Sequence, residues 1–216
     1  MAFGVSGSFI PSTVTSGDPI NITVNRTVDV GDVAMVFVSM DDTNNPVVGV
    51  TDSSGNDYTV YGLVRNEGTV IIAVASIAST LSSGSSTISV NLGSSARALI
   101  RASSYTGVSS SVASSSNKYT VGSNYNISWS GLADGVAFTM FAFPQDYGFE
   151  DDSISGWTQV FVTDDASGVQ SHQVFRKEVE AGTVSCSNSS PSIPYLAMGL
   201  VLPYQRAGYG QAVVVL

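Results

Sequence analysis

The chain has almost none of the residues from which catalytic and metal sites are assembled. Among its 216 residues there is one cysteine, Cys186, and one histidine, His172. A single cysteine excludes a disulfide within the chain, and zinc sites need four ligands that are typically Cys or His. A Ser/His/Asp triad would have to use His172, and no Gly-x-Ser-x-Gly segment holds a serine ready to react. We therefore expect no enzyme activity, no metal site and no cofactor.

Charged side chains are also scarce. They make up 12% of the chain, about half the usual share. Lysine occurs only at Lys118 and Lys177, and most of the 17 acidic residues are Asp rather than Glu. Because Glu and Lys favour helices whereas Asp favours turns, the chain has little material for solvent-facing helices. The net charge of −9, without clustered Lys and Arg to neutralise phosphates, makes nucleic-acid binding unexpected.

Long apolar runs are missing too. No stretch approaches the roughly 18 apolar residues that a membrane-spanning helix needs. The first seven residues, Met1 to Gly7, include neither a basic residue nor a long apolar core, so they do not resemble a secretory signal peptide. We expect neither membrane association nor signal-directed secretion.

What the chain does have is a two-residue periodicity. Residues 21–25 (NITVN) and 87–92 (TISVNL) alternate polar and apolar side chains, as strands with one face in the core do. Residues 33–38 and 70–75 are almost wholly apolar, which favours central strands covered on both faces, by a second sheet and a neighbour. Ser-, Gly- and Asn-rich turns separate the runs. The pattern predicts an all-β fold, an antiparallel β-sandwich, and no amphipathic helix.

Two parts of the chain resemble each other. Residues 30–38 (VGDVAMVFV) are similar to 132–141 (LADGVAFTMF), and 84–89 (GSSTIS) to 182–185 (GTVS). An acidic loop and a β-rich stretch follow each of the first two segments. We expect one domain spanning residues 1–216, built of two half-units of about 1–108 and 124–216. A Ser-rich stretch around Ser109 to Ser123 would join them, and two small sandwiches remain the alternative.

Several of these segments together resemble a recurring β-sandwich module of phage structural proteins and large bacterial surface proteins. The elements that carry the resemblance are a Gly-Asp start, an Asp-Ser-x-Gly-Asn turn, a Gly-x-x-Thr-x-x-Val segment and a Tyr-x-Gly-Val end, here Gly31-Asp32, Asp52 to Asn56, Gly84 to Val90 and Tyr105 to Val108. The resemblance implies a jelly-roll-like sandwich with a binding or structural role, and it brings over no catalytic residue.

An incomplete calcium motif lies within the same turn. Asp52, Ser54, Asn56 and Asp57 place oxygen atoms at nearly alternate positions, but the Gly at position 6 and the Glu at position 12 of a calcium loop are absent. A hairpin turn whose Gly and Asn adopt positive φ is the simpler interpretation. We therefore predict no metal site here.

Aromatic residues offer candidates for partner contact. Trp129 and Trp157 occupy positions where sandwich cores usually take a Trp, so we expect both to pack inside. His172, in an alternating segment, is expected to be a half-exposed strand residue, and Cys186 a buried or semi-buried thiol. Tyr147 and Phe149 lie on an acidic, Gly-containing loop and are the better candidates for exposed contact residues.

The last residues are unusually apolar. The chain ends on Ala212 followed by Val213, Val214, Val215 and Leu216. An apolar, β-branched tail left free would invite aggregation. We expect it to form a paired strand, either within its own sheet or on the sheet edge of a neighbouring subunit.

These expectations converge on a non-enzymatic virion structural protein. A virus particle assembles in the host cytoplasm yet faces the outside, which reconciles the lack of a signal with a Ser-, Thr- and Gly-rich β composition. A capsid decoration or cement protein of a phage head is the favoured hypothesis, with capsid proteins and further copies of the chain as partners. A carbohydrate-binding or adhesion module of a phage tail or cell surface is the alternative. An enzyme is the third hypothesis, and hydrolysis lost in a His172→Ala variant would favour it.

Overall fold

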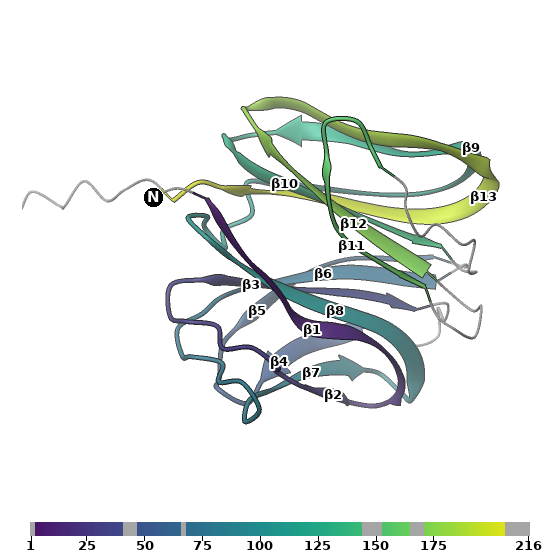
Figure 1. Ribbon diagram of the computed structural model, residues 1–216. Helices are drawn as coiled ribbons and strands as arrows, with labels where there is room; N and C mark the ends of the chain where they lie inside the picture. The colour runs from purple at the N-terminus through teal and green to yellow at the C-terminus, as the bar shows by residue number, and fades with distance from the viewer. Residues whose placement is uncertain (1–2, 41–46, 66–67, 144–152, 165–170, 206–216) are drawn as a thin grey trace, which may run out of the picture.

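The computed structural model describes residues 3–40, 47–65, 68–143, 153–164 and 171–205. Within these ranges the chain forms thirteen β-strands and no helix, and the strands pair antiparallel. Sheets pack face to face (Figure 1). The prediction of an all-β antiparallel sandwich is confirmed.

A first five-stranded sheet runs through the middle of the molecule (Figure 1). Its order is β1-β8-β3-β6-β5. The central strands β3 and β6 are buried along almost their whole length, as their continuous apolar sequences predicted. The strands are β1 (Gly4–Gly17), β3 (Val33–Met40), β5 (Tyr58–Arg65), β6 (Gly68–Ser76) and β8 (Ala96–Thr106).

A small sheet covers one face of this middle sheet. Its order is β2-β7-β4, and β7 alternates between buried and half-buried residues, as expected of a strand with one face in water. Ile22, Ile88 and Val90 pack against Val36 and other residues of the middle sheet. The strands are β2 (Ile20–Thr23), β4 (Val47–Asp52) and β7 (Thr87–Leu92).

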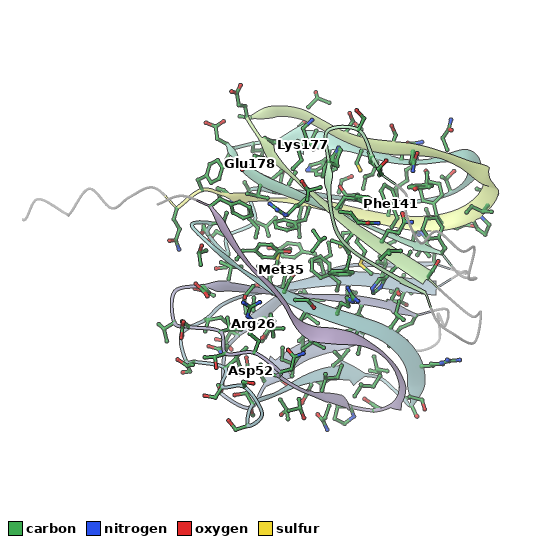
Figure 2. All side chains as sticks on the ribbon, viewed as in Figure 1. Arg26, Met35, Asp52, Phe141, Lys177 and Glu178 are labelled. Carbon is green, nitrogen blue, oxygen red and sulfur yellow. The ribbon has the colours of Figure 1, made fainter. Side chains whose placement is uncertain are left out.

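A second five-stranded sheet covers the opposite face of the middle sheet. Its order is β11-β12-β10-β13-β9, and Met35 and Phe37 of β3 share a core with Phe138 and Met140 of β10. Figure 2 shows Met35 between the two large sheets. The strands are β9 (Ser114–Gly131), β10 (Gly135–Phe143), β11 (Thr158–Asp164), β12 (Ser171–Val179) and β13 (Gly182–Pro203). The second cover of β3 and β6 is therefore the chain's own second half, where the sequence had indicated a neighbour.

The two long strands β9 and β13 pair along nearly their whole length and fold over. Residues 182–189 pair with 124–131, residues 193–201 pair with 114–122, and the register shifts between Ser189 and Ile193. The folded-over part covers the outer face of β10 and β12 (Figure 1). Trp129 and Cys186 thus share a third core with Phe141 and Phe175, and both are buried as expected.

The two halves of the chain repeat one strand order. β1-β8-β3-β6-β5 in the first half corresponds to β9-β13-β10-β12-β11 in the second. The β2–β7 pair of the first half corresponds to residues 124–131 and 182–189 of the folded-over ribbon. Gly55 and Gly156, which precede β5 and β11, both have positive φ, of 79° and 75°. From Ser114 onward, the Ser-rich stretch between the halves belongs to β9.

Candidate functional site

The residues predicted to contact a partner lie outside the part of the chain that the structure describes. These residues are Tyr147, Phe149, Val213, Val214, Val215 and Leu216. Among the described residues there is no helix with the length and apolar character needed to cross a lipid bilayer. The described ranges also contain no group of three or more His, Cys, Asp or Glu side chains arranged to hold a metal ion.

His172 lies between the two halves of the molecule. Its side chain is fully buried rather than half-exposed, because the face of β12 that alternation assigned to solvent is covered by the middle sheet. His172 Nδ1 is hydrogen-bonded to Ser39 Oγ of β3 at 3.0 Å. A serine and the sole histidine thus meet in space, although 133 residues separate them in the sequence.

The surroundings of His172 keep it uncharged. Burial, together with the positive charge of Arg101, lowers its pKa to about 3. The guanidinium of Arg101 lies over the Phe161 ring, 4.8 Å from its centroid, and the Phe161 and His172 rings are 5.5 Å apart. Desolvation also lowers the pKa of Arg101. The His172 ring therefore packs as an apolar group with one polar anchor.

This pair lacks what a hydrolytic site requires. In a catalytic triad a carboxylate bonds the second ring nitrogen and stabilises the imidazolium that forms. Within the described ranges His172 Nε2 is buried and has no hydrogen-bond partner, and both Ser39 and His172 are closed to solvent. The arrangement positions one half of the molecule against the other.

Cys186 is a core residue as well. Burial raises the pKa of its thiol to about 12, so the thiolate needed for nucleophilic attack is not formed near neutral pH. Its Sγ lies on the inner face of β13, opposite Ile127 of β9. The prediction of a buried structural thiol is confirmed.

The Asp-Ser-Ser-Gly-Asn segment is a corner between two sheets. It connects β4 of the small sheet to β5 of the middle sheet, so the predicted hairpin is wrong. Asp52 Oδ1 accepts hydrogen bonds from the amides of Ser54 and Asn56. Asn56 is buried and its Oδ1 accepts the amides of Ala78 and Ser79, both at 2.8 Å. These side chains hold the turn together, and only Gly55 adopts positive φ.

A hollow of the described surface lies on the second half. It has a volume of about 690 Å³. The β9–β13 ribbon supplies one wall, and the segment before β11 supplies the other. We call it the Asn/Ser groove; it is lined by Asn124, Asn126, Ile127, Ser128, Ser153, Ile154, Ser155, Ser185, Cys186, Ser187 and Asn188.

The strand period explains why polar side chains gather there. Asn124, Asn126 and Ser128 alternate with the buried Tyr125 and Ile127, so they share the outer face of β9. Ser185 and Ser187 pair with Ser128 and Asn126 and share that face. The same alternation is visible in the sequence, but neither the pairing of these two strands nor the hollow beside them could be derived from it.

Trp157 lies next to the groove, two residues after Ser155 of its lining, but is not itself a lining residue. Its Nε1 donates a hydrogen bond to the carbonyl oxygen of Ser185 at 3.2 Å. The ring packs partly against the third core and stays half-buried, so the expectation of a core Trp is met only in part. The indole is therefore fixed at the border of the groove with part of its surface in solvent.

A smaller acidic hollow lies at the other end of the second half. It is lined by Asp134, Glu178, Val179, Glu180 and Tyr204. Tyr204 Oη donates to Glu178 Oε2 at 2.6 Å, and Asp134 Oδ1 accepts the Ala181 amide at 2.8 Å. Two of the three carboxylates are thus engaged in bonds that hold β12, β13 and the turn before β10 together.

Comparison of the chain with family models, with curated proteins and with solved structures found no match.

Proposed function

We propose that the chain is a non-enzymatic virion structural protein, a decoration or cement protein that stabilises a phage head through protein–protein contacts. The observation that carries the proposal is the strand pairing of the first half. β1 pairs with β8, β2 with β7 and β3 with β6, and β4 lies against β5. A long hairpin of eight strands wrapped around itself would pair β1 with β8, β2 with β7 and β3 with β6 in this way, which supports a jelly-roll-like arrangement, although β5 joins β6 in the middle sheet rather than pairing with β4.

The second half supports the same interpretation. Its strand order repeats that of the first, with β9 and β13 each serving as two consecutive strands of the wrapped hairpin. Jelly rolls build viral capsid domains and lectin domains. A chain that packs two such units against each other suits a rigid building element.

The chemistry of the interior favours assembly over catalysis. The only histidine and the only thiol of the chain are buried between sheets, and the largest fully buried side chains of the described ranges are those of Tyr, Phe, Ile and Met residues. Of the large apolar side chains in the described ranges, Val30, Val64, Val121 and Leu132 are exposed, and they come from different parts of both halves. We place the protein in the virion, made in the host cytoplasm and assembled as a homo-oligomer.

Particle association tests the proposal directly. Particles of the phage whose genome encodes the chain are banded on a density gradient. They are then labelled with antibody against the purified chain. We expect the chain to band with the major capsid protein and to label heads at regular positions. A chain that stays in the soluble fraction while unlabelled particles band would refute the proposal.

A deletion of the gene tests the cementing role itself. Heads assembled without the chain should release their DNA at a lower temperature than complete heads, and addition of the purified chain should restore the difference. Heads of equal stability with and without the chain would exclude a cementing role, whatever the labelling shows. Light scattering of the purified chain measures the oligomeric state, which we expect to exceed one copy.

A further inference from the structure

We propose that the Asn/Ser groove binds a short, neutral oligosaccharide. The inference goes beyond the structural role proposed above and does not depend on it. It rests on the composition of the groove walls, on the side chains that remain available there, and on the fixed indole at its border. Its volume of about 690 Å³ falls within the roughly 300–1,000 Å³ typical of ligand sites.

The described walls of the groove exclude most ligand classes. None of the described lining residues carries a charge, so a phosphate or sulfate group would find no Arg or Lys partner in the lining. Lys118, on β9, already donates through Nζ to Asn126 Oδ1 at 2.7 Å. Among the lining residues that the structure describes, a hard cation would find no carboxylate. An apolar ligand would leave the many hydroxyl and amide groups of the lining unpaired.

Sugar hydroxyls match the uncharged hydroxyl and amide groups of the described lining. An Asn amide offers a carbonyl acceptor and an NH₂ donor, and a Ser hydroxyl both donates and accepts; the amide of Asn126 is already bonded at both ends. A sugar hydroxyl likewise donates and accepts, so these side chains can bond adjacent hydroxyls of one ring. Asn124, Ser128 and Ser187 are exposed on the ribbon and face such a ligand from the same side.

The polar wall is held in place before any ligand arrives. Asn126 Nδ2 donates to the carbonyl of Asn124, and the Asn126 backbone exchanges two hydrogen bonds with Tyr195 Oη. Asn188 Nδ2 donates to Tyr125 Oη at 2.8 Å, and that hydroxyl donates onward to Gln173. Groups that are already ordered lose little entropy on binding, which favours a weakly bonding ligand such as a sugar.

Trp157 supplies the apolar element that sugar recognition uses. The C–H face of a pyranose ring packs on an indole, whose large flat surface loses little conformational entropy. Because Trp157 Nε1 is bonded to the carbonyl of Ser185, and Ser185 itself lines the groove, the ring is anchored directly beside the polar wall. A sugar that extends from the groove to Trp157 would meet hydroxyl and amide partners within the groove and an aromatic surface next to it.

A glycan microarray that carries neutral, sialylated and sulfated oligosaccharides tests the inference. We expect the purified chain to bind neutral spots and no anionic ones. Titration calorimetry with the best neutral glycan then compares Ser128→Phe with Ser130→Phe. Both serines are exposed on the outer face of β9, but only Ser128 lines the groove. We expect Ser128→Phe to weaken binding about tenfold or more and Ser130→Phe to leave it unchanged.

Each other outcome overturns the inference. Absence of binding to neutral glycans, or binding of anionic glycans alone, contradicts the ligand class. Equal affinity of the Ser128→Phe variant and the unaltered chain places the bound glycan elsewhere, as does equal weakening by both Phe variants when circular dichroism shows both folded. None of these results bears on particle association, so the two proposals fail separately.

Discussion

Acid should destabilise the protein through one residue, His172. Its pKa is about 3 in the folded state against 6.5 for an unperturbed histidine. As the pH falls below 6.5, His172 binds a proton in the unfolded chain but not in the folded chain, so the free energy of unfolding decreases. The stability that the neutral ring provides is therefore complete above pH 6.5 and is lost progressively as the pH falls toward 3.

The size of the effect follows from the pKa difference. Each pH unit between the two pKa values corresponds to about 1.4 kcal/mol, so the 1.5 units from pH 6.5 to pH 5.0 remove about 2 kcal/mol. The chain contains no second histidine, and ordinary carboxylates titrate mainly below this window. His172 thus dominates the change expected above pH 5.

Urea denaturation at pH 7.0, 6.0 and 5.0 measures the effect, with His172→Gln as the comparison. The variant keeps a polar side chain within reach of Ser39 but does not titrate. We expect the unaltered chain to lose about 2 kcal/mol more than the variant over this range. In the folded chain the His172 ring signals should not shift with pH above 5 in an NMR titration. Parallel stability curves, or ring signals that titrate near pH 6.5, would refute the reasoning.

Three further predictions concern packing and the turn. Gly199→Ala would place a Cβ 2.6 Å from the ring of Trp129 and should lower the free energy of unfolding by about 1–3 kcal/mol, measured in urea; an unchanged midpoint would contradict the close packing. Asn56→Ala removes the acceptor of two amides and should cost about 2–4 kcal/mol, whereas Asn91→Ala, at a more exposed site, should cost far less. Cys186 should react with a thiol reagent at pH 8 only after denaturation; rapid labelling of the folded chain would disprove its burial.

The sequence predicted the strands well because their signal is local. Alternation in residues 87–92 and the apolar runs of β3 and β6 report burial through each residue's own chemistry, and the structure confirms them. The order of the strands was beyond this reasoning, because the partners β1 and β8 are about 90 residues apart and nothing in either segment specifies the other.

His172 shows where local reasoning fails. Its segment alternates as a half-exposed strand does, yet the second half packs onto the middle sheet and buries both faces of β12 near its start. The prediction of a hairpin at Asp52–Asn56 was wrong for a related reason. The Gly correctly predicts a turn, but the packing of β4 and β5 decides whether the chain returns in the same sheet or crosses to another. To predict the Asn/Ser groove, both would have to be known: how the halves pack, and where the chain crosses from one sheet to another.

Comparison of the two halves, which repeat one strand order, shows where the groove of the second half differs from the first. In β7 the inward residues are Ile88, Val90 and Leu92, all apolar; the inward residues at the corresponding positions of β13 are Val184, Cys186 and Asn188. The last position of the series has thus become polar, and Asn188 bonds Tyr125 instead of packing in an apolar core.

The turns before β5 and β11 differ at the matching place. After Gly55 comes Asn56, which closes the corner through buried bonds; after Gly156 comes Trp157, which reaches across to Ser185 and keeps part of its ring in solvent. Both differences lie at or next to the Asn/Ser groove. Two halves that share one strand order but differ in the polar and aromatic groups around one hollow are what we expect if the glycan site proposed above belongs to the second half alone.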